Sequence, residues 1–114
     1  MPEFFGFDGQ PISEDEWRML FSDFEGRCAR RDDLERSVFI STVWIGMDPG
    51  YIRVQFFEGL PDIRPRIWET AVFTPAGGWE IYRFPSKDDA LAFHEDQFRA
   101  HGLLENPTLV EHED

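Results

Sequence analysis

Ser37-Val38-Phe39-Ile40-Ser41-Thr42-Val43-Trp44-Ile45 is the stretch that decides the fold. It is rich in β-branched and aromatic residues, which favour extended strands. Its apolar residues fall at both odd and even positions, a pattern typical of a strand in the middle of a sheet that is covered on both faces. Residues 27–31 are also strand-like, and the polar residues 32–35 are typical of a turn. The sequence therefore predicts a central strand over 37–45 that pairs with a strand over 27–31.

Three further strands are predicted downstream. Residues 51–57 alternate between apolar and polar side chains, which indicates a strand with one face in solvent. Residues 66–73 and 79–84 are rich in β-branched and aromatic residues, and the turn-forming residues 75–78 separate them. Strands joined by short turns predict an antiparallel β-meander of about four to five strands. Four of its aromatic residues are expected to lie mostly in the core: Trp44, Trp68, Trp79 and Tyr82.

A first helix is predicted on the N-terminal side of the strands. Ser13 begins the sequence Ser-Glu-Asp-Glu, a capping box in which the serine oxygen and the Glu16 carboxylate satisfy free backbone N–H groups. Gly26 is expected to end this helix. Its core-facing stripe comprises Trp17, Leu20, Phe21 and Phe24. Upstream, Asp8-Gly9 predicts the tight turn of a short hairpin over residues 3–12.

A second helix is predicted over residues 87–101, with Ser86 as its N-cap and Gly102 as its stop. Its apolar stripe comprises Ala90, Leu91, His94, Phe98 and His101, and carboxylates lie on the opposite face. The predicted fold class is therefore α+β: an antiparallel β-meander with two amphipathic helices and a short N-terminal hairpin. It forms one domain over residues 1–102, followed by an acidic tail over residues 103–114.

The composition of the chain disfavours several classes of function. The 114 residues carry a formal net charge of −12, of which residues 1–26 and 86–114 hold −6 each. A surface of this sign repels phosphate, so direct nucleic-acid binding is disfavoured. Cys28 is the single cysteine and can form no internal disulfide, and no apolar run approaches the ~20 residues of a membrane span. The sequence therefore predicts a cytoplasmic protein with no membrane span.

Five blocks of the chain form an ordered series. They are Asp8-Gly9-Gln10-Pro11-Ile12-Ser13 with Glu16-Trp17, Ser41-Thr42-Val43-Trp44-Ile45-Gly46-Met47-Asp48, Ile67-Trp68-Glu69-Thr70-Ala71-Val72-Phe73, Tyr82-Arg83, and Ala90-Leu91-Ala92-Phe93-His94-Glu95. The series resembles a family of short proteins encoded by bacteriophages and by actinobacterial genomes, with the Ser-Thr-Val-Trp and Glu-Thr-x-Val-Phe type motifs as its most specific parts. The family usually has a glycine-rich loop after the equivalent of Asp48 and a glycine before that of His94, and this chain has neither. The resemblance implies a phage or prophage origin and no particular reaction.

Asp48, Glu69 and His94 are the candidate residues of an enzymatic or ligand-binding site. Asp48 follows a predicted strand, and Glu69 lies within an apolar strand, where a carboxylate needs a partner such as Arg83 or His94. An ion pair is the simpler explanation of Glu69. The histidines form no metal-binding motif, because Phe98 stands where His-Glu-x-x-His would place its second ligand. We therefore expect no metal and no cofactor.

These observations favour a non-enzymatic accessory protein of phage type that binds a host or phage protein with a basic surface in the cytoplasm of the bacterial host. The expected contact surface is the acidic face of the second helix: Asp88, Asp89, Glu95 and Asp96. Two alternatives stay open. One is a small enzyme or ligand-binding domain that uses Asp48, Glu69 and His94, and the other is an acidic mimic of DNA. The sequence leaves the oligomeric state and the identity of the partner open.

Overall fold

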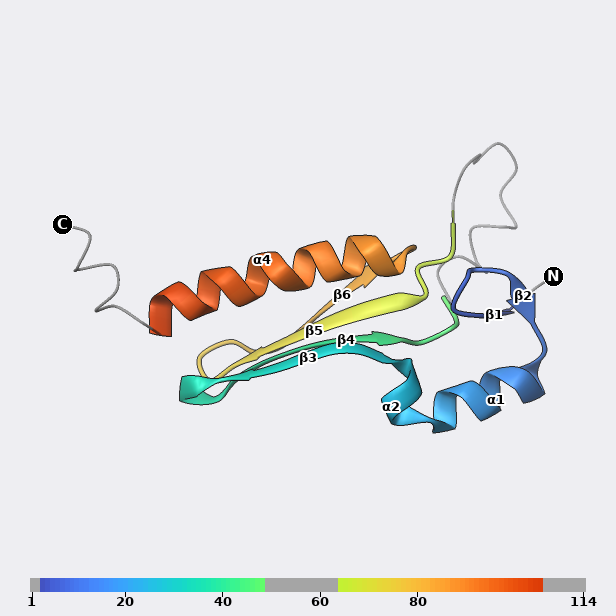
Figure 1. The fold of residues 1–114 in the computed structure, drawn as a ribbon, viewed down its shortest axis with the longest axis horizontal. Coiled ribbons are helices and arrows are strands. Elements are labelled where there is room, and N and C mark those ends of the chain that lie inside the picture. The colour runs from blue at the N-terminus through green and yellow to red at the C-terminus, as the bar shows by residue number, and fades with distance from the viewer. Residues whose placement is uncertain (1–2, 49–63, 106–114) are drawn as a thin grey trace.

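The computed structural model describes residues 3–48 and 64–105 as an α+β fold (Figure 1). Its elements are β1 (Phe4–Phe5), β2 (Pro11–Ile12), α1 (Glu14–Ser22), α2 (Phe24–Arg27), β3 (Cys28–Leu34), β4 (Val38–Trp44), β5 (Trp68–Thr74), β6 (Gly78–Phe84) and α4 (Lys87–Glu105). The predicted fold class is therefore confirmed. The strand predicted over 51–57 and most of the predicted tail lie outside the described residues.

The sheet has the strand order β3-β4-β5-β6, and every neighbouring pair is antiparallel. β4 contains most of the 37–45 stretch and is a central strand, as its sequence predicts. Thr42 lies opposite Thr70, and Trp44 lies opposite Trp68. Since directly opposite residues point to the same face of a sheet, each of these pairs presents two side chains to one face.

The β3–β4 hairpin turns later in the chain than predicted. β3 continues to Leu34, and the turn is the 3₁₀ segment Glu35–Ser37. Arg36 and Ser37 have φ angles of 62° and 59°, the left-handed backbone of a tight hairpin turn. The prediction of a turn over 32–35 is wrong because a charged edge strand is as polar as a loop, so polarity alone does not separate the two.

α4 covers one face of the sheet (Figure 1). Ser86 caps it as predicted, since the Ser86 hydroxyl accepts the Asp89 N–H at 3.1 Å. The helix does not stop at Gly102 but continues to Glu105. A glycine ends a helix where it takes a positive φ, and Gly102 does not. Among the described helices, none has the length and apolar character needed to cross a membrane.

In the described part of the chain, α1 and α2 cover the other face of the sheet at one end only (Figure 1). β4 shows the difference, because its residues alternate between buried ones beneath α4 and half-buried ones on the other face. There Phe39 packs against Phe73 of β5, with ring centroids 5.9 Å apart. The expectation that both faces of the central strand are covered is therefore wrong over much of its length.

The helix predicted over residues 13–26 is divided in two. The Ser13 hydroxyl caps α1 by accepting the Glu16 N–H at 3.1 Å, as the capping box predicts. Asp23 is not helical, and its carboxylate accepts the Gly26 N–H at 3.1 Å to begin α2. This break turns Phe24 away from the core, and the side chain is 51% exposed. The rest of the predicted stripe packs against the core: Trp17, Leu20 and Phe21.

Gly46 allows the chain to pass between two tryptophans. Its φ is 71°, and an added Cβ would lie 2.4 Å from Trp44 and 2.6 Å from Trp17. The Trp17 indole N–H donates to the Ile45 carbonyl at 2.9 Å. A glycine is therefore required here by both conformation and space.

β1 and β2 form the predicted hairpin, with Phe4 opposite Ile12. Its loop is longer than a two-residue turn, because Gly6 N–H donates to the Gln10 carbonyl at 2.8 Å. Phe5 is 4% exposed and belongs to the core. The hairpin therefore closes one end of the hydrophobic core.

Candidate functional site

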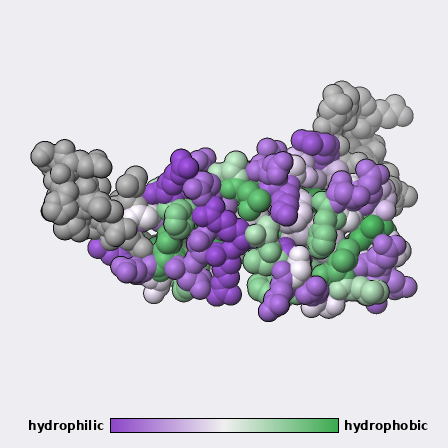
Figure 2. Space-filling model, viewed as in Figure 1, coloured by the Kyte–Doolittle hydropathy of each residue, from purple (hydrophilic) through white to green (hydrophobic). Residues whose placement is uncertain are grey.

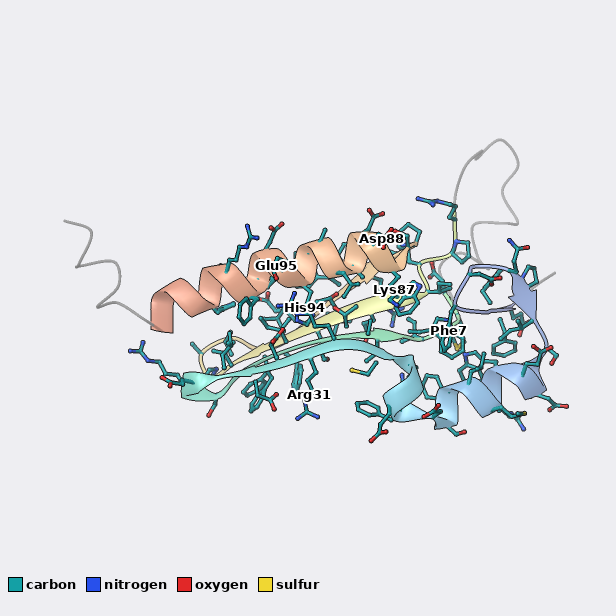
Figure 3. All side chains as sticks on the ribbon, in the orientation of Figure 1. Phe7, Arg31, Lys87, Asp88, His94 and Glu95 are labelled. Atoms are coloured by element: carbon teal, nitrogen blue, oxygen red, sulfur yellow. The ribbon has the colours of Figure 1, made fainter. Side chains whose placement is uncertain are left out.

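His94 is the centre of a buried polar layer between α4 and the sheet (Figure 3). The imidazole has no exposed surface. Its Nδ1 lies 2.8 Å from the Thr42 hydroxyl, and its Nε2 lies 2.7 Å from Oδ2 of Asp32. The Thr42 hydroxyl lies 2.7 Å from that of Thr70, which lies 3.2 Å from the Ala90 carbonyl. Four contacts thus join α4 to three neighbouring strands.

The polar layer reaches the surface through an arginine. The same Oδ2 of Asp32 accepts Arg30 Nε–H at 2.7 Å. Arg30 also donates to Glu95 at 2.6 Å, and Arg99 donates to the other oxygen of Glu95 at 3.2 Å. Arg30 lies 5.1 Å from the centroid of the Phe98 ring. The charges of Asp32 and Glu95 are therefore shared with two arginines.

The polar layer separates two apolar clusters. One cluster is centred on Phe5, Trp44, Ile67, Trp68 and Ala90. The other is centred on Val38, Ile40 and Val72, with Phe93 and Phe98 against it. The layer lies between them along β4, β5 and α4, since Thr42, Thr70 and His94 each fall between members of the two clusters in the sequence. Hydrogen bonding makes this burial of polar groups tolerable.

A count of protons shows how the layer is bonded. The four contacts from Ala90 to Asp32 need four hydrogens, whereas a neutral imidazole and two hydroxyls supply three. The contact of Thr70 with the Ala90 carbonyl is the longest, and within a helix that carbonyl also accepts the N–H four residues later. This contact is therefore the one that can lack a hydrogen when His94 is neutral. A protonated His94 would supply all four.

Burial lowers the pKa of His94, because the enclosed imidazolium would lose its hydration. Hydrogen bonding to Asp32 opposes the shift, but the positive charge of Arg30 acts with burial. Since Arg30 already neutralises the carboxylate that faces the imidazole, a neutral His94 that donates through Nε2 to Asp32 is the favoured form. The pKa of Glu95 is lowered, chiefly by its hydrogen bond from Arg30.

The order hydroxyl, imidazole, carboxylate in Thr42, His94 and Asp32 is that of a catalytic triad. Neither Thr42 nor His94 has any exposed surface, however, so a substrate cannot reach the hydroxyl. A nucleophile must lie within reach of the atom it attacks. The arrangement therefore holds α4 on the sheet and does not form an open active site.

The structure does not bring Asp48, Glu69 and His94 together. Asp48 is buried, and its carboxylate accepts the backbone N–H of Arg66 at 2.9 Å. Glu69 precedes Thr70 in β5, so it points to the face opposite His94. Its carboxylate lies 3.4 Å from Nε of Arg83, the ion pair that the sequence suggests.

The acidic face of α4 is less uniform than predicted. Asp88, Asp89 and Asp96 are exposed, whereas Glu95 is half-buried between Arg30 and Arg99. The acidic residues of α1 lie on the other side of the sheet from those of α4 (Figure 1). Two acidic groups on opposite sides do not form one continuous row of charges like the backbone of DNA.

An aromatic row runs across the face of the sheet that α4 leaves open. Phe73 lies between Phe39 and Trp79, with ring centroids 5.9 Å and 5.1 Å away. Phe39 and Trp79, together with Phe24 and Arg31, line a hollow of about 350 Å³. Arg31 points away from α4 (Figure 3). The side of the molecule seen in Figure 2 carries both hydrophilic and hydrophobic areas. We name the surface formed by Phe24, Arg31, Phe39, Phe73 and Trp79 the open face.

The expectation that the strand aromatics are mostly core is only partly right. Trp44 and Trp68 are buried, but Trp79 is 59% exposed and Tyr82 is 37% exposed. For Trp79 the error follows from the uncovered face, because alternation alone does not tell whether a second layer lies over an apolar face. Tyr82 lies opposite Thr70 on the face that carries α4, and it is exposed because α4 packs less against the edge strand β6 than against β4 and β5. The sequence also does not predict the break of the helix at Asp23, which places Phe24 at the open face.

A second hollow, of about 430 Å³, lies between the N-terminal hairpin, the junction of α2 with β3 and the start of α4. Phe7, Trp68 and Lys87 line it, and Lys87 Nζ lies 5.8 Å from the centroid of Trp68. Asp8, the acid of this hollow, accepts the N–H of Gln10 in its own turn at 3.0 Å. Arg27 and Cys28 also line the hollow, so it combines aromatic rings with two cationic side chains and the thiol.

Within residues 3–48 and 64–105, no group of three or more histidine, cysteine, aspartate or glutamate side chains is placed to hold a metal ion. Comparison of the chain with family models, with curated proteins and with solved structures found no match.

Proposed function

We propose that the protein is a non-enzymatic accessory protein of phage type that binds a host or phage protein with a basic surface in the bacterial cytoplasm. The observation that carries the proposal is the open face, where Phe24 and Trp79 are both more than half exposed around a hollow. Exposed apolar side chains that gather around a hollow mark a contact surface. Aromatic residues with an arginine beside them are the usual anchors of such surfaces.

The placement of the polar residues supports binding over catalysis. His94 has no exposed surface, and Asp48 and Glu69 each pair with a different arginine, Arg66 and Arg83. Each of these side chains is hydrogen-bonded or ion-paired within the fold. None of the three needs a substrate to explain its position.

The charge of the chain supports a basic partner. The net charge is −12, and Asp88, Asp89 and Asp96 point outward from α4. Such charges speed the approach of a basic surface and act over about 8 Å at physiological salt. α4 lies on the side of the sheet opposite the open face (Figure 1), so its charges would attract the partner to the protein as a whole, and the open face would hold it.

Capture of partners by the full chain from a bacterial lysate, followed by purification and titration of the captured protein, tests the proposal. Phe24→Ser removes a ring from the hollow and should weaken binding by about tenfold or more. Met19→Ser is the matched control, because Met19 is 73% exposed on α1 and does not line the hollow. A partner that binds the Phe24 and Met19 variants equally well would contradict the open face as the contact.

A charge-reversed variant, in which Asp88, Asp89 and Asp96 become lysine, tests the guiding role. Its association rate should fall, and rising salt should affect that rate less than in the parent. An unchanged rate and salt dependence would show that α4 is not on the path of the partner. Displacement of the captured protein by duplex DNA would favour the DNA mimic instead.

A further inference from the structure

β6 is an edge of the sheet with an open row of backbone groups. In the described part of the chain it pairs with β5 alone. Five of its seven residues are exposed, and the two at its ends are half-buried. The N–H and C=O groups on the outer side of an edge strand can pair with another strand. β6 therefore offers a seven-residue template for strand addition.

The other edge strand, β3, is better protected against strand addition than β6, which has two charged residues, Glu80 and Arg83, and no bulge. Four of the seven residues of β3 are charged, and its register is broken by a bulge between Cys28 and Arg30. Charges and bulges are the usual means of keeping edges apart. β6 pairs with β5 in a regular register from end to end and contains neither proline nor lysine. Its Trp79 and Ile81 are 59% and 49% exposed.

We propose that two copies of this chain associate through β6. The two strands run antiparallel about a two-fold axis that passes beside Ile81 and stands perpendicular to the sheet. The two four-stranded sheets then form one continuous sheet. A two-fold axis perpendicular to the sheet does not turn the second sheet over. The open faces of the two copies therefore lie on the same side of the continuous sheet.

The sequence of β6 is complementary to itself in this register. Ile81 lies at the centre of the strand, so Gly78 faces Phe84 of the second copy, and all seven residues are paired. Trp79 faces Arg83 of the second copy, a cross-strand pair of an aromatic ring and a guanidinium. Glu80 faces Tyr82 of the second copy. Within one chain the Tyr82 hydroxyl donates to Glu80 at 2.6 Å, so the same two groups bond across the axis after a small change of rotamer.

Neighbouring registers are less favourable. Directly opposite residues of two antiparallel strands lie on the same face of the sheet, and side chains alternate between the faces along each strand. The pairing can therefore shift only by two residues at a time. One shift places Glu80 against Glu80, a like-charge pair. The other places Trp79 against Pro85, which has no N–H to give to the ladder. The register centred on Ile81 therefore has the best match of charge and hydrogen bonding.

The β6 edge has room for a second copy on the face that carries α4. α4 packs mainly against β4 and β5 and less against β6. Phe93 of α4 reaches Tyr82 and Phe84, with ring centroids 4.5 Å and 5.3 Å away, from the inner side of the strand. The helix therefore stands back from the outer edge.

Sedimentation and light scattering of the full chain over a wide range of concentration test the pairing. The wild-type chain should reach twice the mass of one chain, and Ile81→Lys should remain a monomer, since two lysines would meet at the axis. Met19→Lys is the matched control, because it also replaces an exposed apolar side chain with lysine, at a 73% exposed residue of α1, and it should still dimerise. A wild-type monomer at all concentrations, or a dimer that Ile81→Lys leaves intact, would overturn the proposal.

Cross-linking tests the register without relying on a destabilised variant. In a Cys28→Ser background, Ile81→Cys places two thiols at the axis, about 5 Å apart at Cβ. Trp79→Cys places them about 14 Å apart, four residues along the strands. A short thiol cross-linker should join the first variant and not the second, and equal yields would refute this register. A monomer that still binds a partner through Phe24 would leave the proposed function standing.

Discussion

The stability of the fold should fall when the solution is acidified below about pH 6.5, because of His94. The pKa of His94 is lowered in the fold, chiefly by burial, from an ordinary value of 6.5. On acidification the unfolded chain therefore binds a proton at His94 before the folded chain does. The free energy of unfolding then decreases by up to about 1.4 kcal/mol per pH unit for one such group, and the loss ends below the folded pKa.

Urea unfolding between about pH 7.5 and about pH 5.5 measures this slope in the pH range where histidine titrates. His94→Gln is the reference, because glutamine does not titrate and the other histidines remain. The wild-type chain should lose more stability across this range than the variant loses. The opposite sign would mean that Asp32 holds the imidazolium and outweighs burial. Equal slopes would mean that His94 titrates alike in both states, and either result would refute the assignment.

Three further changes test the packing and the turn, each by urea unfolding at neutral pH. Trp17→Ala should cost about 3–5 kcal/mol, since it removes a ring that packs against the core and donates to Ile45, and a free energy of unfolding near that of the parent would contradict this. Gly46→Ala should cost about 2–5 kcal/mol from overpacking and positive φ together, so a neutral effect would show that the tryptophans can move apart. Ser37→Gly should stabilise by about 0.5–1 kcal/mol by relieving a positive φ, and destabilisation would show that the serine makes a needed contact.

The elements of this fold follow from local chemistry. The β-branched and aromatic residues of β4, β5 and β6 predict strands, and the serine caps before α1 and α4 predict where helices begin. Both signals act within a few residues, so they need no knowledge of the rest of the chain. The ends of elements were predicted less well. Gly102 and Gly26 are both possible stops, and only the conformation each one takes decides whether the helix ends there.

The partners of the candidate residues could not be predicted in the same way. His94 was correctly placed on the inner stripe of its helix, and Glu69 was correctly given Arg83 as a possible partner. Asp32 was missed, because its meeting with His94 depends on how far β3 extends and on where α4 lies over it. The spacing of Arg30 and Asp32, two residues apart, was the available signal, since it places both on one face of a strand.

The polar layer has a further consequence for the architecture, because it fixes the position of α4 along the sheet. Ala90 and Phe98 lie one helical turn on either side of His94. If α4 moved by a turn, one of these apolar side chains would face Asp32 and Thr42, and each buried group left without a partner would cost about 1–3 kcal/mol. If only apolar contacts held α4 on the sheet, the same movement would replace one apolar contact with another and would cost little. Buried polar groups of this kind can specify register at some cost in stability. His94 thus explains why α4 settles in one position along the sheet.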